Sequence, residues 1–357
     1  MGRNIVGLAV AAGIVLLLGG CIQTVVGTPA VAPEPPRPPS YREKLTAQMK
    51  AHLSHLDELR GIDPCSLIDR DAAAALAPIS YVGTDRDPLE CEIDFVVPTT
   101  PPKEGFGDRD EVPGHVSQLH AGSRAIDSSP GDQLDHPIHG GGGCLSFLDT
   151  GYTQPDGWHE LLEYNMTISS DFGGHERPGC EDLDPVVDAS RGKSRNPGTR
   201  SSSTTLPHAT LMTMDPCAAV DVLGTQTDIE LIDHPDPFRC DFRNRGDTDN
   251  ESNTARSIRF TYTELSVAED VKKFSKDYRQ LRGVPADVSA GAGYVGQWLC
   301  TVTAYVGLKE PGAGSDPLSS GKQWVSAISV FGGDTHPDCR SVVAVTDEAI
   351  HQYQLAH

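Results

Sequence analysis

Nine cysteines, and the residues around eight of them, constrain the fold of this chain more than any other feature. Cys21 stands alone near the N-terminus, and the other eight form two groups of four with similar neighbours in the same order. The first group is Cys65, Cys91, Cys144 and Cys180, and the second is Cys217, Cys240, Cys300 and Cys339. Self-similarity of this kind indicates an internal duplication, so we predict two tandem repeats.

Four matched contexts carry the prediction of a duplication, and one of them is the match of Cys144 with Cys300, each within an apolar run. Asp63-Pro64-Cys65 matches Asp215-Pro216-Cys217, and Pro88-Leu89-Glu90-Cys91 matches Pro237-Phe238-Arg239-Cys240. Residues 172–180 align without a gap to residues 331–339, since both begin Phe-Gly-Gly and carry a proline two residues before the cysteine. The alternative, two unrelated domains that share cysteines, would have to produce these matches in the same order by chance.

The first twenty residues predict export. Arg3 is followed by an uncharged apolar run over residues 5–18, which is too short to span a membrane, and then by Gly19 and Gly20. Residues 18–21, Leu-Gly-Gly-Cys, resemble the lipobox of bacterial lipoproteins. The resemblance implies that Cys21 receives acyl chains such as palmitate and becomes the first residue once residues 1–20, the signal peptide, are removed. The alternative is a soluble secretion signal in which this cysteine is incidental.

Residues 21–40 are predicted to be a stalk behind the lipidated cysteine. They contain six prolines, which disfavour helix and favour a stiff extended chain. More than one acyl chain gives stable anchoring, so we expect the protein on the extracytoplasmic face of the cell membrane. The chain has 29 Lys and Arg against 50 Asp and Glu, a net charge of −21. That charge excludes nucleic acid as a partner, and it leaves the lipid anchor as the predicted contact with the membrane.

The eight remaining cysteines predict disulfide bonds, because exported proteins fold in an oxidising compartment. Zinc binding is the alternative, but no Cys-x-x-Cys pair occurs in the chain. Four cysteines in a repeat permit three pairings. We favour the first with the second and the third with the fourth, since each pair then closes a local segment, while the sequence leaves the other pairings open.

Each repeat is predicted to be an α+β domain, with an antiparallel sheet, a few helices on one face and two disulfides. We place repeat 1 at residues 41–189 and repeat 2 at residues 207–357, with a linker over residues 190–206 that is rich in Ser, Thr and basic residues. Strands are expected at Cys91, Cys144, Cys240 and Cys300. Alternation of apolar and polar residues predicts three more strands, at Leu162, Tyr164, Met166 and Ile168, at Ile258, Phe260 and Tyr262, and at Trp324, Ser326, Ile328 and Val330.

Helices are predicted from caps and apolar spacing. Ser40 and Glu43 have the form of a capping box before an apolar stripe that runs to Gly61. Asp63 and Asp215 are expected to cap helices over residues 66–76 and 218–223. A second capping box, Ser266 and Glu269, precedes a helical stripe made of Val267, Val271, Phe274, Tyr278 and Leu281.

The Asp-Pro-Cys helix starts, the four spaced cysteines, the acidic composition and the lipobox together resemble the actinobacterial cell-envelope lipoproteins that carry a Cys-rich domain of unknown function, here in two copies. The resemblance implies a membrane-anchored, disulfide-bonded envelope protein, and it brings no catalytic residues with it. The repeats are also similar to the exported sensor domains of actinobacterial Ser/Thr kinases, two-disulfide modules that bind a ligand. Because no kinase segment is present, this second likeness implies binding alone.

Two motifs suggest enzyme chemistry, and their context argues against both. Residues 291–296, Gly-Ala-Gly-Tyr-Val-Gly, match the dinucleotide-binding pattern, but a strand at Cys300 follows where a helix is required, so we predict a glycine turn. Residues 319–322, Ser-Ser-Gly-Lys, match the Ser-x-x-Lys of penicillin-interacting enzymes. That motif opens a helix, whereas here Gly and Pro precede it and a strand follows, so we predict a hairpin loop.

Four histidines in repeat 1 are the candidates for a metal site: His115, His120, His136 and His139. Imidazole and carboxylate suit first-row metals, and Asp135 is close in sequence. His136 and His139 lack helical spacing, however, and solvated loop histidines are common, so we assign no metal and no cofactor.

No catalytic residue emerges, and we therefore predict a non-enzymatic binding module of the cell envelope. Its partner would be a small envelope ligand or another exported protein, held in a groove between the repeats. One alternative is a structural or assembly factor for another exported protein. A third possibility is a metal-dependent enzyme that uses the four histidines.

Overall fold

A computed structural model describes residues 40–96, 117–126, 138–140, 143–153, 157, 159–167, 180–225, 227–232, 236–245, 255–293 and 297–357. For residues 117–126, 138–140, 143, 167 and 180 it describes the backbone alone. The predicted signal peptide, Cys21 and the stalk up to residue 39 lie outside these ranges, as do His115 and His136. We call residues 40–189 the first half and residues 207–357 the second half.

The first half contains an antiparallel sheet in which the strand order is β1-β2-β3-β6-β5-β4. Its strands are β1 (Ile79–Thr84), β2 (Glu90–Phe95), β3 (Ser117–Ile126), β4 (Ile138–Gly140), β5 (Gly143–Thr153) and β6 (His159–Thr167). Leu162, Tyr164 and Met166 on β6 are buried, as their alternation predicts, and Ile168 lies outside the described residues.

The second half contains a second antiparallel sheet, with the order β7-β8-β9-β13-β12-β11-β10. Its strands are β7 (Ile229–Ile232), β8 (Arg239–Asn244), β9 (Arg256–Glu264), β10 (Tyr278–Leu281), β11 (Val284–Ala292), β12 (Trp298–Ala304) and β13 (Trp324–Asp334). Cysteines take corresponding places in the two orders. Cys91 on β2 and Cys240 on β8 lie second from one edge, and Cys144 on β5 and Cys300 on β12 lie two strands beyond β3 and β9.

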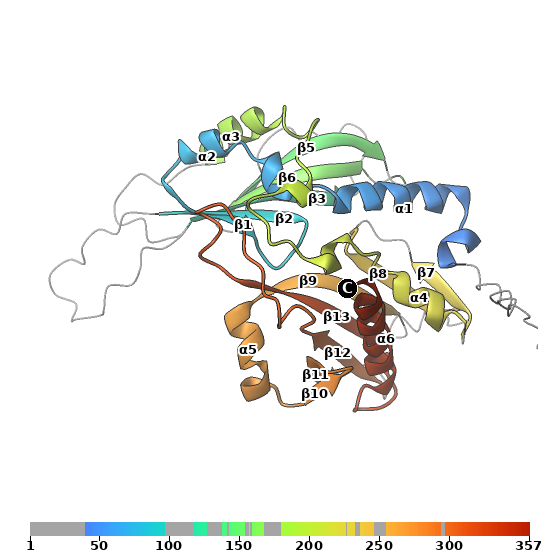
Figure 1. The fold of residues 1–357 in the computed structure, drawn as a ribbon. Helices are drawn as coiled ribbons and strands as arrows, with labels where there is room; N and C mark the ends of the chain where they lie inside the picture. The colour runs from blue at the N-terminus through green and yellow to red at the C-terminus, as the bar shows by residue number, and fades with distance from the viewer. Residues whose placement is uncertain are drawn as a thin grey trace, which may run out of the picture. The chain divides into compact units, whose positions relative to one another are not determined.

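Helices complete the fold (Figure 1). They are α1 (Ala47–Arg60), α2 (Arg70–Ala74), α3 (Leu183–Ser190), α4 (Ala218–Leu223), α5 (Leu265–Phe274) and α6 (Arg340–Ala356), with short 3₁₀ turns η1 (Tyr41–Lys44), η2 (Pro64–Leu67), η3 (Cys180–Asp182), η4 (Arg200–Ser202) and η5 (Thr210–Thr213). No helix in the described part of the chain is both long and apolar enough to cross a membrane.

Both faces of the second sheet carry a helix, which corrects the prediction of helices on one face. Successive residues of β13 point to opposite faces. Ile328 and Val330 are buried in the main core of the second half, to which α6 contributes, whereas Val325 and Ala327 pack in a separate cluster with α5. Figure 1 shows α5 set apart from α6. The prediction is wrong because it treats β13 as a strand with one apolar face. Both faces of β13 are apolar, so each can pack against a helix.

Three of the four predicted disulfides are present: Cys65–Cys91, Cys217–Cys240 and Cys300–Cys339. Cys144 is disulfide-bonded as well, and its predicted partner Cys180 has a side chain outside those described. Both Asp-Pro-Cys triplets form the same turn. The carboxylate of Asp63 accepts a hydrogen bond from the N–H of Cys65 at 2.9 Å, and Asp215 accepts one from Cys217 at 2.9 Å.

Several predicted helix boundaries are wrong. The side chain of Ser40 caps nothing; α1 begins at Ala47, where the hydroxyl of Thr46 accepts the N–H of Met49. Residues 66–76 divide into η2 and α2, because Asp69 starts a new helix with its own cap. The prediction for residues 218–223 is confirmed as α4.

The predicted helical stripe after Ser266 is also too long. Helix α5 ends at Phe274, the side chain of Ser266 is not its cap, and Tyr278 and Leu281 belong to strand β10. Strand β10 pairs with β11 from Tyr278–Asp287 to Leu281–Val284. The spacing of apolar residues along the chain cannot reveal that Tyr278 and Leu281 pair with another strand. This pairing supplies the backbone hydrogen bonds that a longer helix would have made.

Candidate functional site

The halves meet where the β1–β2 hairpin of the first packs against the second. β1 is an edge strand, and the long loop between β12 and β13 covers part of its free edge. The N–H of Val82 donates to the carbonyl of Leu318 at 3.3 Å, and the hydroxyl of Ser319 donates to the carbonyl of Val82. Covering an edge in this way prevents the strand from pairing with another chain.

The turn of the same hairpin contacts strand β9 of the second half. β9 extends beyond its last pairing with β8, Arg239–Arg259, and the N–H of Tyr262 then donates to the carbonyl of Arg86 at 2.9 Å. The guanidinium of Arg259 lies 2.7 Å from the carboxylate of Asp87. Arg86 and Asp87 thus contact β9 of the second half through one backbone hydrogen bond and one ion pair.

One ammonium group joins the two halves through two carboxylates. Lys322 Nζ lies 2.8 Å from Glu92 Oε1 and 3.2 Å from Asp94 Oδ2, and it sits 3.9 Å from the ring centroid of Tyr81. The Tyr81 hydroxyl accepts a hydrogen bond from Trp324 Nε1 at 3.1 Å and donates to the carbonyl of Thr84 at 2.9 Å. Cation–π contact and charge-assisted bonds of this kind hold both side chains in place.

Burial shifts the titration of these groups. It raises the pKa of Glu92 to about 7, and the nearby Asp94 charge adds to the rise although Lys322 opposes it. Burial lowers the pKa of Lys322, but the hydrogen bond and charge of Glu92, together with Asp94, outweigh it and leave the pKa raised. Burial also raises the pKa of Tyr81 to about 12. The lysine is therefore a permanent cation, while Glu92 changes charge near neutral pH.

A cavity of about 700 Å³ opens beside these contacts, and we call it the inter-half groove. Its residues come from the β1–β2 hairpin and from strands β9, β12 and β13, together with α5 and the loop before β13. They are Asp85, Arg86, Asp87, Glu92, Arg259, Thr261, Tyr262, Thr263, Glu264, Val267, Thr303, Tyr305, Lys322, Trp324 and Ser329.

Two hydroxyls on adjacent strands, those of Thr303 and Ser329, belong to the lining of the inter-half groove. Thr303 is paired with Ser329 across β12 and β13, and Ser329 is paired with Arg259 across β13 and β9. The hydroxyls of Thr303 and Ser329 lie 3.1 Å apart. Each hydroxyl can donate and accept, the carboxylates accept and the guanidinium donates, so the groove offers both kinds of partner to a polar ligand. None of the described residues lining it is a histidine or a cysteine.

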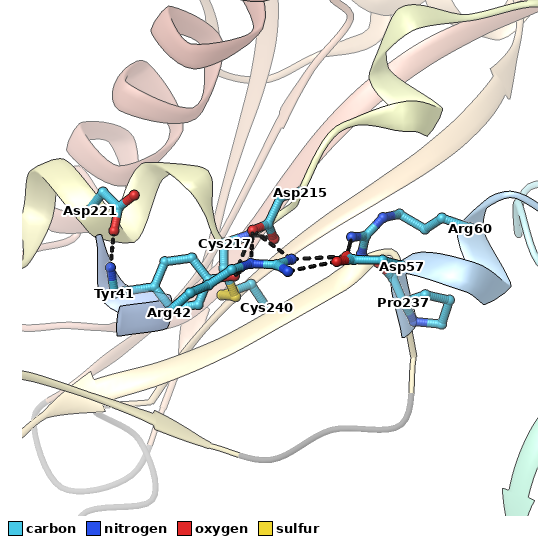
Figure 2. A network of polar contacts seen from close by, with 9 residues as sticks. All are labelled: Tyr41, Arg42, Asp57, Arg60, Asp215, Cys217, Asp221, Pro237 and Cys240. Carbon is cyan, nitrogen blue, oxygen red and sulfur yellow. Dashed lines mark hydrogen bonds and ion pairs between the residues drawn. A yellow bond between two sulfur atoms is a disulfide. The ribbon is translucent and has the colours of Figure 1, made fainter. Parts of the chain in front are cut away.

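A separate polar network fastens the N-terminal segment, residues 40–60, to the second half (Figure 2). We call this segment the N-terminal strap. The Tyr41 hydroxyl donates to Asp215 Oδ2 at 2.6 Å, Arg42 Nε donates to the same oxygen at 3.0 Å, and the Tyr41 N–H bonds to Asp221. Asp57 of α1 accepts both terminal nitrogens of Arg42, at 2.6 and 2.9 Å.

Arg60 ends the same network. It bonds to Asp57 and donates to the carbonyl of Pro237 at 2.7 Å. Both residues are buried, and this burial raises the pKa of Tyr41 and lowers that of Arg60. Figure 2 shows the strap beside the Cys217–Cys240 disulfide, which places it against a rigid part of the second half. This network stabilises the fold, and no local pattern in the sequence indicates a contact between Tyr41 and Asp215.

The histidine candidates are dispersed in the described part of the chain. His120 is on β3, opposite Glu92 in the β2–β3 pairing, and His139 is on β4, opposite Cys144. Strands β6 and β5 lie between β3 and β4. Among the residues whose side chains are described, no group of three or more His, Cys, Asp or Glu is placed to hold a metal ion.

The two enzyme-like motifs have structural roles. Lys322 pairs with Glu92 and Asp94, while Ser319 bonds to Val82, and both belong to the loop before β13 as predicted. In the motif at residues 291–296, Gly291 and Ala292 belong to strand β11, and the N–H of Gly293 donates to the carbonyl of Gln297 at 3.0 Å. Residues 294–296 lie outside the described residues, and the element that follows them is strand β12, whereas a dinucleotide site requires a helix there.

No protein-family model, no curated protein and no solved structure matches this chain.

Proposed function

We propose that this protein is a lipid-anchored, non-catalytic binding module of the cell envelope, and that its ligand binds in the inter-half groove. The lipobox at Cys21 supports the anchor and the location on the extracytoplasmic face. One observation supports the binding role most strongly: the groove of about 700 Å³ takes its lining from both halves. Small-molecule sites typically have volumes of about 300–1,000 Å³ and form between domains.

The two halves are, in this proposal, tandem copies of one domain, residues 41–189 and 207–357. Matched cysteine contexts support it, and so does strand order. Read from β1, the first sheet runs β1-β2-β3-β6-β5-β4; read from β7, the second runs β7-β8-β9-β13-β12-β11-β10. If β4 corresponds to β11, the orders agree and β10 is an addition. A duplicated domain creates a groove along its own internal interface.

The ligand that best fits the groove is small and rich in hydroxyl groups, such as one or two sugar units. Thr261, Thr263, Thr303 and Ser329 contribute hydroxyls to the lining, and charged side chains of both signs line the same groove. A ligand with many hydroxyls can pair with donors and acceptors alike. A ligand carrying a large net charge would meet like charges on some part of this lining.

Calorimetric titration of the purified full-length protein with mono- and disaccharides tests this proposal. We expect saturable binding, and we expect the double variant Thr303→Val/Ser329→Ala to bind at least tenfold more weakly with an unchanged unfolding temperature. Ser320→Ala, an exposed serine outside the groove, is the matched control and should bind as the wild type does. Binding by no saccharide, or equal binding by the double variant, contradicts the proposal.

A protein partner is a second candidate, favoured by the exposed apolar surface of α5. Val267 is 51% exposed and Phe274 is 68% exposed, and both border a cavity of about 740 Å³ between α5 and strand β11. A photo-crosslinking residue at position 274 should capture one dominant exported protein in cells. Leu355, which is 69% exposed on α6, is the matched control position. Equal capture from both positions contradicts this function.

A further inference from the structure

The first half contains a smaller cavity that is distinct from the inter-half groove. Its volume is about 180 Å³, and α1, η2, β5, β6 and the segment after α3 all contribute to it. Most of its lining is apolar: Leu59, Ile62, Pro64, Leu67, Leu89, Leu162 and Pro197. The polar lining residues are His55, Thr150, Glu160 and Ser194.

A histidine–carboxylate pair forms the polar side of this cavity. His55 Nε2 lies 2.8 Å from Glu160 Oε2, and the two side chains are 19% and 5% exposed. The His55 ring is stacked on the Tyr152 ring, with centroids 3.5 Å apart and planes inclined by 19°. The hydroxyl of Thr150 donates to the Glu160 carbonyl at 3.0 Å. Stacking on one ring and bonding to a buried carboxylate hold the imidazole in one orientation.

The pair supplies hydrogen-bond acceptors next to an apolar surface. The contact between His55 Nε2 and Glu160 Oε2 is a hydrogen bond in which the imidazole N–H donates to the carboxylate. The second oxygen of Glu160 retains acceptor capacity, because an ionised carboxylate has about four acceptor positions. A hydrogen bond to a buried carboxylate is stronger than one to an exposed carboxylate. A ligand without a donor would leave that buried carboxylate unpaired, which costs binding free energy.

We propose that this cavity binds a small apolar molecule with one hydrogen-bond donor, of the size and chemistry of a phenol. An apolar cavity of about 150 Å³ holds benzene, so 180 Å³ suits a six-membered ring with one substituent. The leucines and prolines contact the ring, and the Glu160 carboxylate, which His55 holds in place, accepts a hydrogen bond from the hydroxyl group. A site built around a hydroxyl discriminates strongly against analogues that lack it.

Calorimetric titration of the full-length protein with phenol and with toluene tests the proposal. The two probes have similar size, and toluene lacks the donor. We expect phenol to bind at least tenfold more tightly than toluene. In Glu160→Gln, the affinity for phenol should fall about tenfold and the affinity for toluene should not change. Equal affinity for both probes, or no binding of phenol, overturns the proposal.

A measurement on the wild-type protein keeps the test decisive if Glu160→Gln fails to fold. Nuclear magnetic resonance of the histidine rings should show the His55 signals shifting as phenol is added. His351, on α6 in the other half, is the internal control, and its signals should not move. Unchanged His55 signals at a saturating phenol concentration also overturn the proposal.

Discussion

Asp63 and Asp215 occupy the same position in the two Asp-Pro-Cys triplets, yet they have different partners in the folded protein. Each accepts a hydrogen bond from the N–H of the cysteine two residues later, at 2.9 Å in both cases. Asp215 additionally binds the side chains of Tyr41 and Arg42 from the N-terminal strap. A local turn is thus present in both halves, whereas the long-range contact built on it occurs at Asp215.

The two cores show the same contrast. Tyr41, at the start of the described chain, is buried in the core of the second half. Leu206, from the predicted linker, is buried in the core of the first half, and Leu318 of the second half packs against that core. Each core therefore includes a residue from beyond its own half. The two halves are alike in their local turns and disulfides. The residues that each core takes from outside its own half make the stability of one half depend on the other.

Removing a disulfide from either half tests the likeness and should have the largest effect. Cys65→Ala/Cys91→Ala and Cys217→Ala/Cys240→Ala open loops of similar length, with separations of 26 and 23 residues. Each double variant should lose about 3 kcal/mol of unfolding free energy in guanidinium titrations. If only one of the two double variants lost unfolding free energy, the two disulfides would not have equivalent roles.

Replacing Lys322 tests the contact between the halves. Lys322→Met keeps the apolar stem but leaves Glu92 and Asp94 facing each other without a cation, so we expect a loss of about 2 kcal/mol at pH 8. The loss should be smaller at pH 5, where Glu92 is protonated. Lys272→Met, at an exposed position on α5, is the control for thermal unfolding and should have little effect. An equal loss at both pH values would contradict the role of Glu92.

The wild-type protein should itself become less stable from pH 5 to pH 8. The pKa of Glu92 is raised from 4.5 to about 7, and burial together with Asp87 and Asp85 raises that of Glu90 to about 7 as well. The folded state therefore binds these protons more tightly than the unfolded state does. Their contribution is complete below about pH 4.5 and is lost as the pH rises through 7. Glu92→Gln should flatten the curve of unfolding temperature against pH, and a curve of unchanged slope would refute the assignment.

The two aspartates offer a direct test of their different partners. Asparagine keeps the oxygen that accepts the cysteine N–H, so Asp63→Asn should cost less than about 0.5 kcal/mol. Asp215→Asn also loses its charge-assisted bonds to Tyr41 and Arg42, and we expect about 1.5 kcal/mol. Urea unfolding of the two variants measures the difference. Equal losses would mean that the strap adds no stability through Asp215.

An effect smaller than that of Asp215→Asn is expected for one of two neighbouring serines. Ser319 is buried and donates to Val82 across the contact between the halves, whereas Ser320 is exposed and donates to the carbonyl of Pro317. Ser319→Ala should cost about 1 kcal/mol, and Ser320→Ala should cost little. The same urea measurement serves here. If Ser320→Ala proved the more damaging, the covered edge of β1 would not depend on Ser319.

Sequence patterns predicted the parts of the fold that depend on neighbours in the chain. The strands at the cysteines, the alternation at Tyr164 and at Phe260, and three disulfide pairings are confirmed. Each depends on a repeat of two residues or on a turn that closes a short loop. The extent of α5 was wrong because Tyr278 fits a helical stripe equally well, and strand pairing with β11 decided its structure.

The candidate sites were much less accessible from the sequence. Lys322 and Glu92 are 230 residues apart, and His55 and Glu160 are 105 residues apart. No periodicity connects residues at such separations, and the only signal at Lys322 was a motif that indicated the wrong chemistry. The expectation of a binding groove between the repeats named none of the residues that line the inter-half groove.

The N-terminal strap also has a consequence for the order of folding. Tyr41 is 174 residues before Asp215 and 180 residues before Asp221. Because the chain is synthesised from its N-terminus, the N-terminal strap is made before α4. It can contact Asp221 only after α4 has been made. Closing so long a loop is slow and entropically costly, so we expect this contact to form late in folding. Until this contact forms, the core of the second half lacks Tyr41. We therefore expect binding of the N-terminal strap to be one of the last steps in folding.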